Sequence, residues 1–138
     1  MVKKMSDDYP TDNWLMDLFK DWYDPCPLRS QKDGLLEEWK ERTFINPPYS
    51  NPKPWVLKAI RSNREYKNTI VLLLKMDSST AWFTALQEAG AQFLWVNKRL
   101  KFRTGKSAPF PSMLAILKGG ETCQRSESQK SQSLLQYQ

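Results

Sequence analysis

Apolar residues recur along the chain with helical and strand-like spacings, and their alternation predicts the order of its elements. From Thr11 or Asp12, either of which can cap a helix, "DNWLMDLFKDW" carries apolar residues on one helical face. They are Trp14, Leu15, Leu18, Phe19 and Trp22. Pro25 and Pro27 in "DPCP" end this helix, because proline cannot continue one. The following stretch "DGLLEEWKE" has room for one helical turn, and "TFI" (43–45) predicts a short strand.

The middle of the chain continues this alternation. Residues 52–63, "PKPWVLKAIRSN", predict a helix whose outward face carries Lys58 and Arg61. Its buried face is formed by Trp55, Val56, Ala59 and Ile60. Residues 68–76, "NTIVLLLKM", predict a strand buried on both faces, which is typical of the middle of a parallel sheet. A capped helix follows in "SSTAWFTALQEAG" (78–90), which ends at a glycine and turns inward Trp82, Phe83 and Leu86.

Three apolar runs close the sequence, "AQFLWV" (91–96), "RLKF" (99–102) and "SMLAIL" (112–117). Strands that alternate with helices indicate an α/β layered fold, and the closing strands predict an antiparallel hairpin. We therefore predict a mostly parallel sheet with a C-terminal antiparallel hairpin.

The 138 residues are enough for one domain with a real core. We predict a loose charged start at 1–8, a single domain at 9–118, and a disordered Gln/Ser-rich tail at 119–138.

Composition excludes several classes of site. The chain has no histidine and two cysteines, so zinc chemistry and histidine-assisted nucleophiles are excluded, and we expect no metal. No apolar run approaches the roughly 20 residues that cross a bilayer, so we expect no membrane partner. The start "MVKKMSDDYP" lacks the apolar region of a secretion signal, which predicts a cytoplasmic protein.

The charge distribution points to a polyanionic partner. The net charge is +6, and five cations lie between Leu94 and Phe110 without an acidic residue among them. They are Lys98, Arg99, Lys101, Arg103 and Lys106. A solvated lysine-rich hairpin explains this cluster equally well, so the pattern by itself leaves both interpretations open.

The motif "NPPY", Asn46 to Tyr49, follows the predicted strand 43–45 directly. Two prolines donate no backbone N–H, so the strand stops there in a stiff turn at the carboxyl end of the sheet, where ligands of open α/β sheets bind. The Asn46 amide oxygen and the Pro47 carbonyl could accept both N–H groups of a planar amine such as adenine N6. Tyr49 could stack on the base. A base in a duplex reaches such a turn only if it is flipped out.

Several ordered blocks of the chain resemble one enzyme family. "NPPY" is similar to the (D/N/S)PP(Y/F/W) motif of S-adenosylmethionine-dependent amino-methyltransferases. The blocks around it resemble the phage-type, Dam-like DNA N6-adenine methyltransferases. They are "YPTDNWLMDLF", "WYDPCPL", "KDGLLEEW", "FINPPYS", "PWVLKAI", "VLLLKMDSSTAWF", "RLKF" and "SAPFPSMLAIL". The resemblance runs from about Tyr9 to Leu117.

The resemblance implies a compact Rossmann-like methyltransferase sheet, reduced at its N-terminal half, with S-adenosylmethionine as methyl donor and DNA as partner. Asn46, Pro47, Pro48 and Tyr49 would form the target-amine site. The donor would be bound by Thr11, Asp24, Pro25, Cys26 and Asp33. Turn formation is the alternative role for Asp24 and Asp33.

The chain departs from the family's pattern where the donor would bind. "DPCPLRSQ" stands in place of a Gly-rich loop, and only eight residues separate Asp24 from Asp33. Weak donor binding, a homodimer that completes the site, and loss of activity are each compatible with this shortening. The alternatives to DNA methylation are an amino-methyltransferase acting on RNA or a protein glutamine, and a non-catalytic nucleic-acid-binding module. The basic cluster argues against glutamine.

Overall fold

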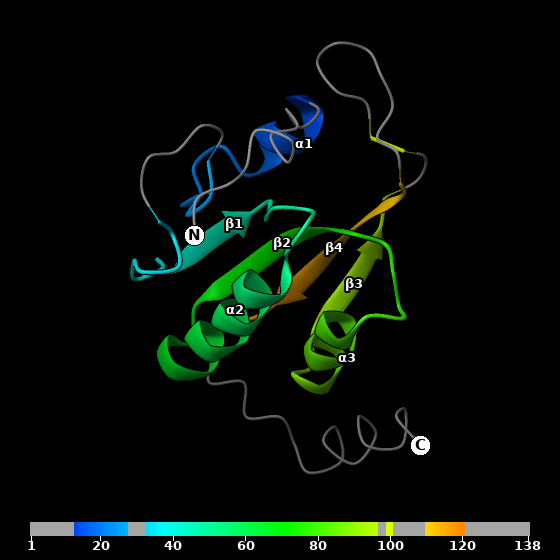
Figure 1. Cartoon of the computed structure of the whole chain (residues 1–138). Helices are drawn as coiled ribbons and strands as arrows, with labels where there is room; N and C mark the ends of the chain where they lie inside the picture. Colours follow the sequence, from blue (N-terminus) through cyan, green and yellow to red (C-terminus); the bar gives the residue numbers. More distant parts are fainter. Residues whose placement is uncertain (1–12, 28–32, 97–98, 101–109, 121–138) are drawn as a thin grey trace, which may run out of the picture.

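A computed structural model describes residues 13–27, 33–96, 99–100 and 110–120 (Figure 1). The described strands form one four-stranded sheet in the order β1-β2-β4-β3. Their bounds are β1 Arg42–Ile45, β2 Thr69–Lys75, β3 Gln92–Trp95 and β4 Ser112–Leu117. Tyr23 adds an isolated parallel bridge to Thr43 on the outer side of β1.

The α/β class is confirmed, but the sheet is mixed. β1 and β2 pair in parallel, whereas β4 is antiparallel to both β2 and β3. The prediction of a mostly parallel sheet was therefore wrong for the described strand pairs. The antiparallel close is present as β3 and β4. The difference arises because β4 inserts between β2 and β3, so β3 has no parallel neighbour among the described strands.

Helices cover both faces of this sheet. α2, Lys53–Tyr66, and α3, Ala81–Glu88, lie together on one face, and α1, Asn13–Leu18, lies apart from them (Figure 1). Alternate residues of β2 enter two different cores, as expected for a strand buried on both faces. Leu72 belongs to the core under α2 and α3, and Leu73 belongs to the core that contains Leu15 of α1. The central position predicted for β2 is thus confirmed.

The first helix is shorter than its apolar pattern predicts. α1 ends at Leu18, and both Trp14 and Leu18 are more than half exposed, at 55% and 63%. Phe19 nevertheless packs inward and stacks on Phe44, with ring centroids 4.3 Å apart. The chain leaves the helix because Tyr23 pairs with β1, where its N–H donates to the Arg42 carbonyl at 2.9 Å.

Two further expected elements differ. "DGLLEEWKE" contains a turn in which the Leu36 N–H donates to the Asp33 carbonyl at 3.0 Å, and no helix forms there. Of "RLKF", Arg99 and Leu100 belong to no strand, while Lys101 and Phe102 lie outside the described residues.

Within the described ranges, no helix is long and apolar enough to cross a bilayer. The same residues contain no group of three or more His, Cys, Asp or Glu side chains that could hold a metal ion.

Candidate active site

Three segments end at one edge of the sheet. Tyr23 and β1 run in parallel, as do β1 and β2, so the residues that follow each of them emerge at the same carboxyl edge. These residues are Asp24, Asn46 and Met76. Carboxyl ends of parallel strands are where α/β sheets bind ligands. A ligand site is therefore expected at this edge.

The Asn46–Tyr49 turn is largely buried. Asn46 is 7% exposed, Pro47 and Pro48 are buried, and Tyr49 is half-buried. The turn closes where the Asn51 N–H donates to the Pro48 carbonyl at 3.2 Å. α2 starts directly afterwards at Lys53, with a proline at the start of the helix. A proline tolerated in the first turn of a helix stiffens the exit from this motif.

The Tyr49 ring meets an aromatic residue from the other end of the chain. Tyr49 and Phe110 make an edge-to-face contact with centroids 4.5 Å apart and an interplanar angle of 71°. The Lys75 Nζ lies 6.0 Å from the Phe110 ring centroid. The sequence contained a signal for Phe110, because "SAPFPSMLAIL" belonged to the resemblance, but no role was assigned to that residue.

A cavity of about 240 Å³ opens beside Tyr49. It is bounded by the motif, the end of β2 and the start of α3, through Pro47, Tyr49, Ser50, Pro52, Leu74, Lys75, Asp77, Thr80 and Trp82. Hydrogen bonds from the Ser79 side chain and backbone lower the pKa of Asp77, so this carboxylate stays ionised at neutral pH. Sequence reasoning missed Lys75 and Asp77, because a helix cap explained "MDSST" adequately.

Both proposed donor carboxylates are held in turns by their own backbone. An Asp24 carboxylate oxygen accepts from the Cys26 N–H at 2.8 Å. An Asp33 oxygen accepts in the same way from the Leu35 N–H at 3.0 Å. The alternative role of turn formation is therefore present at both positions. Because a side chain in such a turn is oriented by its own backbone, this role fixes each carboxyl group and is compatible with ligand binding.

The Asp24 and Asp33 turns lie against each other. A Cβ placed on Gly34 would be 1.8 Å from the Pro25 carbonyl oxygen and 3.0 Å from Cζ3 of Trp55. The two turns also share a link, because the Tyr23 hydroxyl donates to the Glu37 carboxylate. Burial, followed by this bond to Glu37, raises the pKa of Tyr23, which keeps its hydroxyl protonated as the donor. The structure thus joins Asp24, Pro25 and Cys26 to Asp33.

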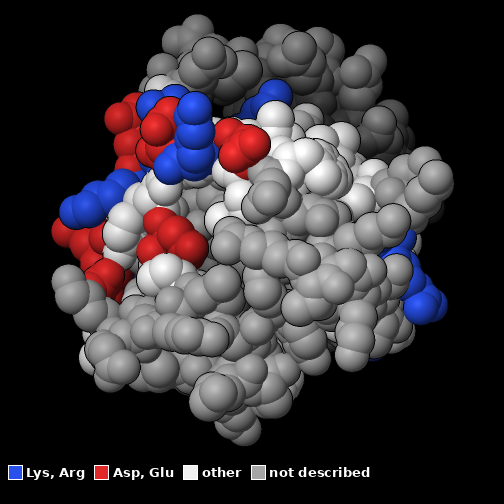
Figure 2. All heavy atoms as spheres, turned by 90° about the horizontal axis from the view of Figure 1, so that it is seen from above, with Lys and Arg blue, Asp and Glu red and all other residues white. Residues whose placement is uncertain are grey.

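The predicted basic cluster is described only in part. Arg99 is exposed, whereas Lys98, Lys101, Arg103 and Lys106 lie outside the described residues, as does Thr11. Figure 2 shows the molecule from above the view of Figure 1. In its described part, Lys and Arg side chains are interleaved with Asp and Glu on one side of the view. The DNA-binding assignment of the cluster therefore stays a prediction.

A comparison with protein families gives the chain its relatives. The family described as DNA N-6-adenine-methyltransferase (Dam) matches residues 26–136. The chain belongs to this family. The Dam match includes Asn46–Tyr49, Cys26 and Asp33, and it begins after Thr11, Asp24 and Pro25.

Two curated Dam relatives are phage proteins named DNA N-6-adenine-methyltransferase. The protein of Escherichia phage T1 is 39% identical over 74 residues, which are 51% of this chain and 31% of that protein. The protein of Haemophilus phage HP1 is 36% identical over 77 residues, which are 54% of this chain and 44% of that protein. The matched part thus spans less than half of either relative. No solved structure matches the chain.

Proposed function

We propose that this chain transfers a methyl group from S-adenosylmethionine to N6 of adenine in DNA. The observation that carries the proposal is the buried Asn46–Tyr49 turn at the carboxyl edge of β1, in a chain that belongs to the Dam family. The names of the two phage relatives supply the substrate and the reaction. Only seven residues, 46–52, connect the end of β1 to the start of α2, so the turn is held at both ends and could orient a base.

Asn46 and Pro47 would orient the target amine. The N6 nitrogen is a poor nucleophile because its lone pair is delocalised into the adenine ring. The Asn46 side-chain oxygen and the Pro47 carbonyl would each accept one N–H, which favours the pyramidal nitrogen needed for attack. The N6 lone pair forms a bond to the methyl carbon as the sulfur–carbon bond breaks toward sulfur. The amine proton leaves afterwards. Tyr49 would stack on the base, and Pro48 would hold the turn.

The donor fits the neighbouring turns by charge. S-adenosylmethionine supplies an activated methyl group, and its methionine part carries an ammonium that pairs with a carboxylate. Asp24 is the residue proposed for that ammonium, with Pro25 and Cys26 in the same turn and Thr11 closing the pocket. Asp33 would lie near the adenosine. The contact between Gly34 and Pro25 supports this assignment, because it joins both carboxylate turns into one surface.

The remaining assignments follow from this function. The base would be flipped from a duplex held by Lys98, Arg99, Lys101, Arg103 and Lys106 through its phosphates. We propose that β1, α2 and β2 form part of a Rossmann-like methyltransferase sheet whose N-terminal half is reduced. A homodimer is proposed as the means of completing the short donor region, and its test is the mass of the protein in solution. A DNA substrate is compatible with the proposed cytoplasmic location, which would be the host cytoplasm for a viral protein.

The test is transfer of a labelled methyl group to adenine-containing duplex DNA, single-stranded DNA and RNA, with N6-methyladenine identified in the digest. Asn46→Ala should lower the transfer rate about 10²- to 10³-fold, as loss of one transition-state contact does elsewhere, with donor affinity unchanged. Asn46→Asp keeps acceptor oxygens and should retain measurable transfer. Equal loss of transfer and donor binding in Asn46→Ala would show that Asn46 is misplaced. Label in RNA alone would change the substrate, and absence of donor binding would favour a non-catalytic module.

A further inference from the structure

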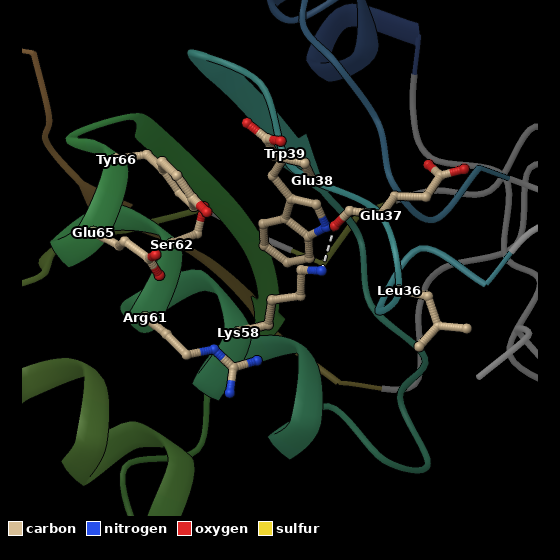
Figure 3. Close-up of a pocket in the computed structure, with 9 residues that line it drawn as sticks. All are labelled: Leu36, Glu37, Glu38, Trp39, Lys58, Arg61, Ser62, Glu65 and Tyr66. Atoms are coloured by element: carbon tan, nitrogen blue, oxygen red, sulfur yellow. Dashed lines mark hydrogen bonds between the residues drawn. The ribbon is translucent and has the colours of Figure 1, made fainter.

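Lys58 of α2 does not point outward as its position in the helical pattern predicts. Its Nζ donates to the Leu35 carbonyl at 2.7 Å and also to the Glu37 carbonyl. The ammonium lies 5.5 Å from the centroid of the Trp39 ring. Figure 3 shows the side chain extending from α2 toward this segment, whereas the guanidinium of Arg61 points away from it. Lys58 thus binds the backbone of residues 33–39, which we call the 33–39 segment.

The environment of Lys58 confirms that its charge is partly withdrawn from water. Burial lowers the pKa of Lys58, the nearby charge of Arg61 lowers it further, and Glu37 acts in the opposite direction. The cavity around it, about 260 Å³, is lined by Leu36, Glu37, Glu38, Trp39, Lys58, Arg61, Ser62, Glu65 and Tyr66. A lysine held here without carbonyl partners would be costly, so the two hydrogen bonds are what stabilise its inward conformation.

The 33–39 segment connects Lys58 to both carboxylate turns. Its Trp39 indole N–H donates to the Gly34 carbonyl at 2.9 Å, which folds the segment back on itself. Gly34 in turn packs against Pro25 in the Asp24 turn. Through these contacts a change at Lys58 would reach both turns without any contact between Lys58 and a ligand.

Lys58 also stands on the helix that leaves the proposed catalytic turn. Lys53, the first residue of α2, follows Tyr49 by four positions, and Lys58 lies little more than one helical turn further on. Trp55 of α2 also packs beside Trp39 of the 33–39 segment, with ring centroids 6.4 Å apart. This contact adds apolar packing between the helix and the segment. Lys58 thus makes a polar contact between α2, which follows the Asn46–Tyr49 turn, and the 33–39 segment, which begins with the Asp33 turn.

We propose that Lys58 is a positioning residue, which fixes the 33–39 segment and thereby the Asp24 and Asp33 turns for the methyl donor. This inference rests on the proposed function. Without the ammonium, the Leu35 and Glu37 carbonyls need other partners, and the segment spends part of its time away from the binding geometry. The apparent dissociation constant of a ligand rises by the inverse of the fraction of protein that is competent to bind.

The test compares Lys58→Met, which keeps the aliphatic stem and removes the donor group, with Arg61→Met as matched control. Arg61 is an exposed cation on the same helix and lines the same cavity. S-adenosylmethionine is titrated without DNA, and methyl transfer is then measured at saturating donor. We expect Lys58→Met to raise the donor dissociation constant about tenfold, which corresponds to a competent fraction of about one tenth. Transfer at saturating donor should stay within about twofold, and Lys58→Arg should restore most of the affinity.

Three outcomes separate the inference from the function on which it rests. If the unmodified protein does not bind S-adenosylmethionine, the proposed function fails and the inference fails with it. In the second outcome, the unmodified protein binds S-adenosylmethionine, and Lys58→Met and Arg61→Met have the same donor affinity. That result overturns the inference alone, even if the melting temperatures of the two variants differ. Should Lys58→Met fail to fold, Lys58→Gln, which keeps a weaker N–H donor, takes its place in both measurements. A donor dissociation constant raised above that of Arg61→Met supports the inference, and an equal constant overturns it.

Discussion

Gly34→Ala gives the sharpest test of how the two carboxylate turns meet. The added Cβ would lie 1.8 Å from the Pro25 carbonyl oxygen, whereas ordinary Cβ contacts are 3.4 Å or longer. Because the opposing atom belongs to the backbone, no side-chain rotation can relieve the clash. The turns must therefore separate by about 1.5 Å. Overpacking typically costs 1–3 kcal/mol, and a backbone obstacle places this substitution near the upper end, at about 3 kcal/mol.

Thermal unfolding by circular dichroism measures this cost, with Gly90→Ala as control. Gly90 has φ +82 and nothing within 4 Å of an added Cβ, so its substitution tests backbone conformation without a clash. We expect Gly90→Ala to lower the free energy of unfolding by about 1 kcal/mol. Gly34→Ala should lower it by about 3 kcal/mol, which corresponds to a melting temperature lowered by about 10 °C. Donor affinity should fall only in Gly34→Ala. Equal melting temperatures for the two variants would refute the close contact between the Asp24 and Asp33 turns.

Two further predictions concern charge. Asp24→Asn keeps an oxygen that can accept from the Cys26 N–H, so we expect little change in melting temperature and a donor dissociation constant raised about 10- to 100-fold, measured by titration. An unchanged constant would remove Asp24 from the donor site. Alanine at Lys98, Arg99 and Lys101 should lower the slope of DNA affinity against salt by about 2 to 3, measured by fluorescence anisotropy. The control is alanine at three other exposed cations, Arg61, Arg64 and Lys118. If this control lowers the slope equally, the effect comes from net charge and not from the predicted DNA-binding residues.

Helices and the central strand could be predicted because their signals are local. The apolar spacing of Trp55, Val56, Ala59 and Ile60 matches the buried face of α2, and the unbroken run Ile70–Leu74 is buried as predicted. The end of α1 could not be predicted in this way. Trp22 continues the helical spacing, but pairing between Tyr23 and Thr43 requires an extended chain one residue later. A contact across twenty positions of sequence thus overrides a local pattern.

Strand order and the orientation of Lys58 were missed for related reasons. No local pattern encodes that β4 enters the sheet between β2 and β3, because both of these pairings join residues far apart in the sequence. Helical spacing places Lys58 on the polar side of α2. Its long stem allows the ammonium to bend back to two carbonyl groups that the spacing does not reveal. Both errors concern contacts with distant parts of the chain, namely the strands that pair with β4 and the carbonyls that bind Lys58. The elements β4 and α2 were themselves predicted.

The residues of the candidate site were predicted partly from chemistry and partly from resemblance. The motif "NPPY" can be recognised from its residue types, because two prolines end a strand and leave a turn after it. By residue type Asp24 and Asp33 indicated only turns, and the resemblance assigned them to the donor. Their proximity is shown by Gly34, which packs against Pro25. Phe110 was within a recognised block, but its contact with Tyr49 depends on the position of β4.

Hydrogen bonds among residues 23–39 explain how the proposed donor region can be stiff although it is short. A Gly-rich loop would present backbone N–H groups, but "DPCPLRSQ" replaces it, and the described turns gain their order from side chains instead. Asp24 and Asp33 each bind their own backbone, the Tyr23 hydroxyl binds the Glu37 carboxylate, and Lys58 binds two carbonyls of the same segment. Rigid support of this kind keeps functional groups within the small tolerances that binding requires. Because the contacts of Asp33, Tyr23 and Lys58 meet in the 33–39 segment, substitutions at Gly34 and Lys58 should affect affinity for the proposed donor more than any substitution on the exposed face of α2.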